Sequence, residues 1–560
     1  MKYKKKDVVI GVLAVVIVSF GVINIILGLP SAILSPPLSK TFVIGTQSPP
    51  FVLDPVDSLD SSSNFVLEQV VETLFSYNLY DHTTPRVPLL AETWWWENST
   101  TLHIKLKEGI LFHDLNPFDA NATKWNLDRM LYFFNCTGTL PTNTSVADPA
   151  FLYYFSDGVT PIIKSVISDY AYNVTIYLND VFGPFLDLLS YTSSSMLSPN
   201  STPRYRYINL IYERVVGTGP FVYEYYTPNV EIELGRFESY WEGPAFFETV
   251  VMTIIGDSIE RNNAMLNHSI DWLTGGMTTL YPTFEVDPLI HLEKFTEKYG
   301  LPGLTYCYLG MNNKKINVTW RKAISYAINY TYMLEILGYN FVVRADSPIS
   351  PGFGTAYNAS VTAADYNLTV ARQTLVDAGI ATGYPINADP DDTYWLNNPL
   401  VSFNYTQNVN SGFREVVAAV LIAWLPAIGI NVVNDRVTWS EYLDRLFNRH
   451  DYLELFWICW GPYYKEPFDM LDHLFNPISY ANSAQVNDTK LNTMMALALE
   501  TTDDTARNTI YKNIQWYLAN RLFPHCFGYH QQVYYIHSAD LRAVPYNALG
   551  KFYAYPIYRT

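Results

Sequence analysis

The feature that most constrains this chain is an uncharged apolar run near its start. After MKYKKKD, residues Val8 to Leu29 include no charged side chain, and as a helix they would be about 33 Å long, enough to span a bilayer. The preceding lysines are expected to stay in the cytoplasm and to send the remainder outside. We therefore expect residues 1–29 to be a lysine-rich start and an uncleaved anchor in the cell membrane, with a cleaved signal peptide as the alternative. Residues 30–40 would form a tether rich in Pro and Ser.

Length and charge limit what the exported part can be. The 560 residues predict two or three domains, and 49% hydrophobic with 16% charged residues predicts a folded chain. The net charge is −17, and the sequence has no Lys/Arg-rich run beyond its first residues. Such a chain is repelled by phosphate backbones, so we expect no nucleic-acid partner.

Two further patterns bear on an extracytoplasmic location. The four cysteines, Cys136, Cys307, Cys459 and Cys526, allow up to two disulfides in three connectivities, or they are buried thiols. N-x-S/T sequons, frequent beyond the apolar run, indicate a glycoprotein, unless an Asn/Thr-rich surface produces them by accident. With an uncleaved anchor, they suggest an archaeal cell surface. The sequons begin at Asn98, Asn121, Asn135, Asn143, Asn173, Asn200, Asn267, Asn317, Asn329, Asn358, Asn367, Asn404 and Asn487.

Strand-like and helical patterns alternate along the chain, which predicts a mixed α/β fold. The expected strands are 41–45, 101–109, 173–178, 305–312, 400–407, 430–437 and 451–460. The expected helices are 61–77, 121–134, 317–337, 367–379, 413–429, 438–448 and 505–521.

A series of short motifs occurs in a fixed order along residues 41–560. They are Leu53-Asp54-Pro55, Pro88 to Trp94, Lys107 to Asp114, Gly217 to Phe221, Arg321 to Ile328 and Ala378-Gly379. In this order they resemble the oligopeptide/dipeptide-type (family 5) extracellular solute-binding proteins of ABC importers. His113 and Asp114, which as a pair suggest acid/base chemistry, belong in that family to a fold signature in a loop.

The resemblance implies a two-lobed, class II periplasmic-binding-protein-like α/β fold that closes on a ligand by hinge motion. Lobe one would be 41–305 plus 535–560, with the extra subdomain of peptide-binding relatives at about 66–210 packed against it. Lobe two would be 306–534, and the hinge crossings would lie near Leu304–Tyr308 and Tyr529–Tyr535. The implied partners are a small-molecule ligand and ABC permease subunits. We expect that the protein is not an enzyme, because no G-x-S-x-G, H-E-x-x-H or phosphate loop is present. We also expect a monomer that needs no cofactor.

The stretch WICWGPYYKEP at Trp457–Pro467 is the candidate ligand site. In peptide-binding relatives a W-x-x-D aspartate here pairs with the ligand's α-amino group, and a basic residue stands three positions before the Trp. Tyr463 and Trp457 occupy those two places. The candidate ligand-binding residues are Trp457, Trp460, Tyr463, Tyr464, Lys465, Glu466, Gln47, Phe51, Tyr405 and Trp439.

Replacing two charged positions by aromatic residues leaves the ligand class open. An oligopeptide-like ligand would be held through its backbone, with Lys465 or Glu466 recognising charge. An oligosaccharide would stack on the aromatic side chains, and an adhesive or sensory surface glycoprotein on this scaffold is a third possibility. His525, Cys526, His530 and His537 follow no usual zinc spacing, so no metal site is expected.

Overall fold

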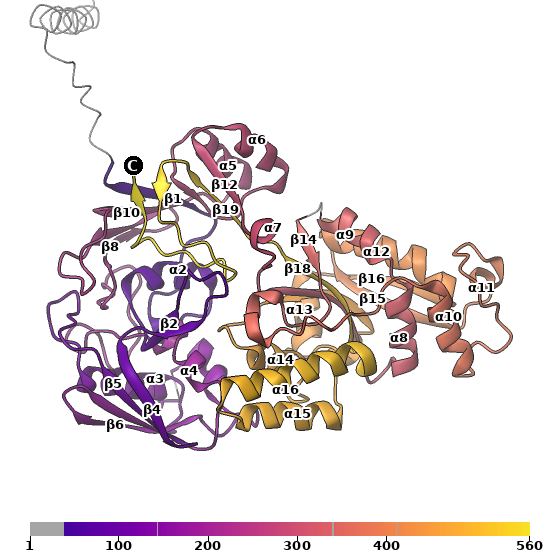
Figure 1. The fold of residues 1–560 in the computed structure, drawn as a ribbon, viewed down its shortest axis with the longest axis horizontal. Coiled ribbons are helices and arrows are strands. Elements are labelled where there is room, and N and C mark those ends of the chain that lie inside the picture. The colour runs from indigo at the N-terminus through magenta and orange to yellow at the C-terminus, as the bar shows by residue number, and fades with distance from the viewer. Residues whose placement is uncertain (1–38, 143, 339–340, 410) are drawn as a thin grey trace, which may run out of the picture.

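The computed structural model describes residues 39–142, 144–338, 341–409 and 411–560 (Figure 1). The expected membrane anchor and all but the last two residues of the expected tether lie outside these ranges. Among the helices of the described residues, none combines the length and the apolar character needed to cross a bilayer.

Lobe one is built on a seven-stranded sheet of order β12-β19-β11-β1-β10-β9-β8. The first strand, TFVIGT, pairs in parallel with both β10 and β11, and its Phe42 and Ile44 are fully buried on one face. Helix α2 (Ser61–Val70) begins where the Asp60 carboxylate accepts a hydrogen bond from Ser63 N at 2.9 Å. The strands are β1 (Thr41–Thr46), β8 (Phe221–Thr227), β9 (Glu231–Arg236), β10 (Thr249–Ile254), β11 (Trp272–Leu273), β12 (Ile290–Lys294) and β19 (Tyr534–Ser538).

Lobe two is built on a six-stranded sheet of order β14-β18-β13-β17-β15-β16. Every residue of the central strand β13 is buried, as its continuous apolar sequence requires. The strands are β13 (Tyr306–Met311), β14 (Val342–Arg344), β15 (Val401–Asn408), β16 (Ile430–Val437), β17 (Leu455–Trp460) and β18 (His525–Gln531). The main helices are α8 (Val318–Ala327), α9 (Tyr330–Gly338), α10 (Leu368–Asp377), α12 (Gly412–Trp424), α13 (Trp439–Phe447), α14 (Pro467–Phe475), α15 (Thr489–Glu500) and α16 (Asp504–Tyr517).

A four-stranded antiparallel sheet, β4-β5-β7-β6, forms the core of a smaller subdomain with helix α3. Asp54 of the Leu-Asp-Pro motif joins this subdomain to lobe one, because its buried carboxylate pairs with Arg129 of α3, with Oδ1 2.9 Å from Nη1. The elements are β4 (Ala91–Asn98), β5 (Thr101–Leu106), β6 (Ile163–Tyr170), β7 (Asn173–Leu178), α3 (Ala120–Phe133) and α4 (Phe185–Leu188).

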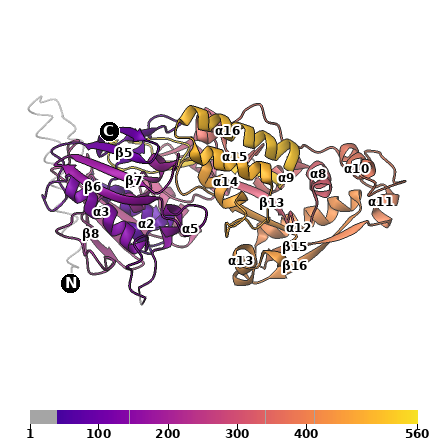
Figure 2. The same ribbon diagram turned by 90° about the horizontal axis from the view of Figure 1, so that it is seen from below.

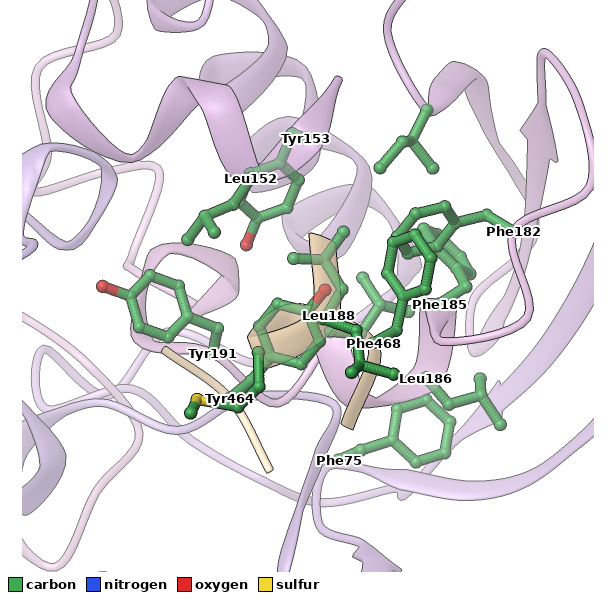
Figure 3. Close-up of a cluster of buried hydrophobic side chains, with 14 of the residues drawn as sticks. Phe75, Leu152, Tyr153, Phe182, Phe185, Leu186, Leu188, Tyr191, Tyr464 and Phe468 are labelled. Atoms are coloured by element: carbon green, nitrogen blue, oxygen red, sulfur yellow. The ribbon is translucent and has the colours of Figure 1, made fainter. Parts of the chain in front are cut away.

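The subdomain also packs against lobe two, which the sequence did not predict. The ring centroids of Phe182 in the subdomain and Phe468 in α14 are 6.1 Å apart. Figure 3 shows Tyr464 and Phe468 of lobe two among Phe185 and Leu188 of the subdomain. Figure 2 shows α14 and α16 on the side of lobe two that faces the subdomain, while α10 lies at the far end. One continuous apolar core therefore spans the boundary between the subdomain and lobe two.

Phe112-His113-Asp114 and Gly217-Thr218-Gly219-Pro220, from two of the sequence motifs, contact each other, and His113 and Asp114 bind different partners. His113 Nε2 lies 2.9 Å from the carbonyl oxygen of Gly219, and Asp114 accepts hydrogen bonds from the hydroxyls of Ser198 and Ser201. A Cβ added to Gly217 would lie 2.3 Å from the Val70 carbonyl oxygen, so this close backbone approach requires glycine. The motif residues stabilise the junction of α2 with the subdomain.

Two expected helices are shorter than their periodicity predicted. The helix expected at 61–77 ends at Val70, whose carbonyl accepts a hydrogen bond from Gly219 N at 3.0 Å, and strand β2 (Phe75–Tyr77) follows. The helix expected at 317–337 is broken into α8 and α9, because Ile328 is extended and Asn329 accepts a hydrogen bond from Tyr332 N. In both cases a partner distant in sequence or a new helix cap ends the periodic segment.

The chain passes between the two large sheets twice. It leaves lobe one after α7 (Phe295–Tyr299) and enters β13, and it returns between β18 and β19. The two crossing segments lie side by side, since Gly303 N donates to the Gln531 carbonyl at 2.9 Å. The two crossings therefore form one paired connection between the large sheets.

Candidate functional site

A cleft of about 350 Å³ lies between the lobes next to the crossings. Its volume falls in the range of small-molecule sites, roughly 300–1,000 Å³. Every part of the fold contributes to the lining: helix α2, the subdomain, the first crossing, the loop after β17 and the C-terminal segment. The lining residues are Ser61, Asn64, Phe65, Glu68, Tyr77, Ser190, Tyr191, Thr192, Leu304, Thr305, Gly461, Pro462, Tyr463, Tyr464, Lys465, Leu549, Gly550, Lys551 and Phe552.

The loop between β17 and α14 carries the aromatic residues expected at the site. Tyr463 lies in the lining, and its backbone N donates to Asp469 Oδ2 at 2.9 Å. Its ring contacts Phe151 of the subdomain and His473, with centroid distances of 5.4 Å to each. Tyr464 also lines the cleft but is mostly buried. Tyr463 is therefore placed between the two lobes.

Asp469 lies directly behind this loop. Burial raises the pKa of its carboxyl to about 7, and its Oδ1 has no hydrogen-bond partner among the described residues. Trp460 does not line the cleft but stacks on His473, with ring centroids 5.4 Å apart. A buried acid in the first turn of α14, six residues after Tyr463, therefore supports the loop from within.

Glu466 and Lys465 have different roles in the structure. Glu466 is buried, caps α14, and binds Arg507 Nε at 2.9 Å and Tyr511 Oη at 2.8 Å, so it is committed to an ion pair within lobe two. Lys465 does line the cleft, but its Nζ donates to the carbonyls of Thr83 and Thr84. Burial lowers the pKa of this lysine to about 8. Lys465 thus joins lobe two to the segment after β2.

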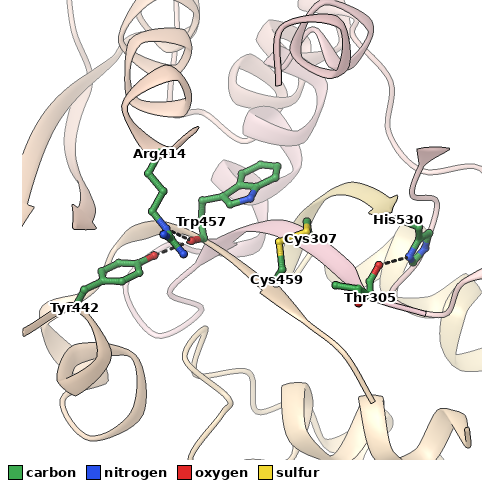
Figure 4. Close-up of a disulfide and its surroundings, with 7 residues drawn as sticks. All are labelled: Thr305, Cys307, Arg414, Tyr442, Trp457, Cys459 and His530. Carbon is green, nitrogen blue, oxygen red and sulfur yellow. Dashed lines mark hydrogen bonds between the residues drawn. A yellow bond between two sulfur atoms is a disulfide. The ribbon is translucent and has the colours of Figure 1, made fainter. Parts of the chain in front are cut away.

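Trp457 lies in the core of lobe two and not in the lining of the cleft. Side chains alternate along β17, and Trp457 and Cys459 belong to the opposite face from Phe456 and Ile458. Trp457 as a whole is 2% exposed. Figure 4 shows its carbonyl accepting hydrogen bonds from Arg414 and Tyr442, at 3.0 and 2.7 Å. The expectation that Trp457 binds ligand is not supported by this position.

The remaining candidates lie away from the cleft. Tyr405 is fully buried in the core of lobe two. Trp439 is half exposed at the start of α13, with the Arg414 guanidinium 5.5 Å from its ring. Gln47 lines a neighbouring hollow of about 420 Å³ that shares Ser61 and Phe65 with the cleft. Phe51 is 79% exposed and lines neither hollow.

One disulfide lies at the edge of the site and selects among the pairings that the sequence left open. Cys307 of β13 pairs with Cys459 of β17, and these are neighbouring strands (Figure 4). β13 follows Thr305 of the first crossing, and β17 leads into Gly461 of the cleft loop. Cys136 and Cys526 are free thiols. The disulfide therefore joins the crossing to the loop that carries Tyr463.

Sequence reasoning missed the contribution of helix α2 and of the C-terminal segment. Glu68 projects from α2 one turn after Asn64, and Lys551 pairs with it at 2.9 Å. Glu68, Lys551 and Tyr77 also line a second cavity of about 190 Å³ next to the cleft. The i, i+4 spacing of Asn64 and Glu68 marks a shared helix face, but nothing in the sequence placed residue 551 opposite that face.

The histidines considered for a metal site are separated. His525 and His530 are buried in lobe two, whereas His537 belongs to β19 of lobe one. Burial lowers the pKa of His525 to about 3 and of His530 to about 4. Within the described ranges, no group of three or more His, Cys, Asp or Glu side chains is arranged to hold a metal ion.

Comparison with known proteins agrees with this architecture. Residues 86–482 match the model of the bacterial extracellular solute-binding proteins, family 5 Middle. The glutathione-binding protein GsiB of Shigella flexneri serotype 5b is 24% identical over 491 residues, which cover 85% of this chain and 86% of that protein. The solved structure of HbpA2 from Haemophilus parasuis superimposes with a TM-score of 0.77 at 19% identity, over 93% of this chain and 100% of that chain.

A second solved structure extends this comparison. The periplasmic binding protein DppA from Helicobacter pylori, in complex with the peptide STSA, gives a TM-score of 0.70 at 21% identity, over 93% of this chain and 98% of that chain.

Two lobes joined by two crossings around a cleft define an α/β periplasmic-binding-protein fold. The match over residues 86–482 goes further: the chain belongs to the family 5 extracellular solute-binding proteins. It is a solute-binding protein and not an enzyme.

Proposed function

We propose that this protein is an extracytoplasmic receptor that captures an oligopeptide-like ligand between its lobes and delivers it to an ABC importer. The observation that carries the proposal is the cleft of about 350 Å³, which takes its lining from both lobes and one crossing. The peptidic ligands named for GsiB, with glutathione, and for DppA, with STSA, favour the same ligand class.

The lobes, as proposed units, are residues 41–305 with 535–560 and residues 306–534, and the hinge is the pair of crossings. Opening would break the contacts that span the lobes. These include Lys465 on the Thr84 carbonyl at 3.1 Å and the ion pair between Arg86 and Asp504 at 2.9 Å. Opening of this kind is the usual way in which two-lobed receptors admit a ligand.

Membrane attachment through residues 8–29, N-glycosylation and a monomeric state complete the proposal. The apolar run and its lysines support the anchor. The asparagines of the described sequons are all exposed or half-buried, as glycan attachment requires. An archaeal cell surface suits both features, and permease subunits would be the protein partners.

An oligosaccharide is the second candidate ligand, and the aromatic lining favours it. Phe65, Tyr77, Tyr191, Tyr463 and Phe552 all line the cleft, and aromatic faces suit the apolar faces of sugar rings. An adhesive or sensory glycoprotein on the same scaffold would need no permease. Titration of the protein with a peptide library and with a glycan array separates the two ligand classes.

Tyr463→Ala tests whether this cleft is the binding site. We expect the free energy of ligand binding to fall by more than the free energy of unfolding, because Tyr463 lines the cleft from the lobe that must close. Tyr463→Phe is the matched control, since it keeps the ring and removes only a hydroxyl 3.4 Å from that of Tyr480. Normal ligand affinity in folded Tyr463→Ala would reduce the aromatic cluster to packing.

A further inference from the structure

The cleft contains a charged pair that the sequence did not reveal. Among the described residues that line it, the charged side chains are Glu68, Lys465 and Lys551. Glu68 Oε1 and Lys551 Nζ are 2.9 Å apart, and their side chains are 25% and 22% exposed. A carboxylate and an ammonium therefore face the ligand space together, partly shielded from water.

This pair is held by two segments that are themselves fixed to each other. The Gln69 side chain, next to Glu68 on α2, accepts a hydrogen bond from Ala554 N at 2.9 Å and donates to the Phe552 carbonyl at 3.3 Å. The buried Asn547 side chain donates to the Lys551 carbonyl and accepts from the Lys551 amide, at 2.9 and 3.1 Å. The backbones beneath both charges are thus preorganised, and only the side chains must move.

Lys465 is not equally available to a ligand. Its ammonium already donates to two backbone carbonyls across the lobe boundary. By contrast, the described residues give Glu68 and Lys551 only each other as ion partners. Since an ammonium has three donors and a carboxylate several acceptor sites, both groups keep unused hydrogen-bonding capacity toward the cleft.

We infer that the ligand is a short peptide with both termini free, whose ammonium binds Glu68 and whose carboxylate binds Lys551. In the structure, Lys551 shows how an ammonium sits on Glu68. A ligand carrying one charge would separate the pair and leave the other partly buried charge uncompensated, which is costly. A ligand with both charges exchanges one ion pair for two, whereas a neutral sugar would use neither charge. The inference rests on the proposed function.

The second cavity gives this binding mode a place for a side chain. Glu68 and Lys551 line both the cleft and the cavity of about 190 Å³. A peptide held at the pair therefore lies against residues that the two spaces share. Leu79, Val87 and Leu89 supply an apolar part of the lining of the second cavity, to which Glu72 and Glu242 also belong. An apolar residue next to the ligand's ammonium fits this space.

The test measures binding of tripeptide pools to the full chain by equilibrium dialysis and mass spectrometry. One pool, composed of Ala, Leu and Lys tripeptides, has free termini; two matched pools are N-acetylated or C-amidated. We expect the wild type to retain the free pool at least tenfold better than either blocked pool. Glu68→Gln should lose that preference for a free amine, and Lys551→Met should lose the preference for a free carboxylate.

Folding and function are controlled separately. Glu92→Gln breaks a surface ion pair with Lys105 and should bind like the wild type, and melting midpoints report whether each variant is folded. Wild-type selectivity for free termini in folded Glu68→Gln would overturn the inference while the proposed function stands. Failure of the wild type to retain any pool would overturn the proposed function itself.

Discussion

Reduction of the Cys307–Cys459 disulfide should destabilise lobe two far more than the rest of the molecule. The bond closes a loop with a sequence separation of 152 residues. In the chain-entropy description, cross-linking a loop of that length lowers the entropy of the unfolded state by an amount worth about 5 kcal/mol at 25 °C. The bonded strands β13 and β17 are neighbours at the centre of the lobe-two sheet. The lost constraint therefore acts on the part of the fold that carries the cleft loop.

Hydrogen exchange followed by mass spectrometry can locate this effect. With the bond intact, amides of β13 and β17 should exchange through global opening of lobe two. After reduction, or in Cys307→Ala/Cys459→Ala, their protection should fall by about 5 kcal/mol, while amides of β1 and β10 in lobe one keep most of theirs.

Cys136→Ser is the matched control, because Cys136 is a free thiol in the subdomain. This variant should respond to reductant like the wild type, and the double variant should not respond at all. A loss of protection below 1 kcal/mol in β13 and β17, with reduction verified by mass, would refute the reasoning.

Three other substitutions probe buried charges and the lobe contact. Arg507→Met should lower the free energy of unfolding by about 3–5 kcal/mol, because it leaves buried Glu466 without its ion partner. Arg206→Met is the matched control: its pair is exposed, so the same denaturant titration should show little change. Burial raises the pKa of Glu72 to about 7 from 4.5, so its contribution to stability is complete below pH 4.5 and is lost as the pH rises through 7. In Glu72→Gln, the decline in stability between pH 4.5 and 8 that Glu72 causes, as much as about 3 kcal/mol, should be absent from melting curves. If stability falls with pH as steeply in the variant as in the wild type, the assignment is contradicted. Lys465→Met should weaken ligand binding about tenfold in calorimetric titrations, since closure then lacks the charged hydrogen bonds to the Thr83 and Thr84 carbonyls; unaltered affinity would show that closure does not use them.

Much of the fold could be predicted, because the periodicity of apolar residues is local and the order of the short motifs along the chain is characteristic of a family. The strand at Thr41–Thr46 and the helix at Leu368–Asp377 match their expected ranges within about two residues. Helix ends were harder, because their causes are distant: Val70 ends α2 on the Gly219 amide, a contact between residues far apart in sequence.

The sequence placed some of the residues that line the cleft and not others, for physical reasons. A loop rich in aromatic residues, with Gly and Pro, drew attention to Tyr463, Tyr464 and Lys465, and the structure places these three in the lining of the cleft. The structure places Trp457 in the core of lobe two and not in the cleft lining, because a strand reverses its side chains at each residue and motif alignment does not record which face the cleft takes. Glu68 and Lys551 were missed because their pairing depends on tertiary structure that brings the C-terminal segment onto α2.

The central claim is that the cleft between the lobes receives a peptide, and one measurement tests it most directly. Isothermal titration calorimetry with a pool of tripeptides that have free termini is done on the wild type and on Tyr463→Ala. It tests both whether peptides bind and whether they bind in the cleft. The account predicts saturable binding to the wild type that weakens at least tenfold in the folded variant. Equal affinity in both proteins, or heat only from an oligosaccharide pool, would contradict it.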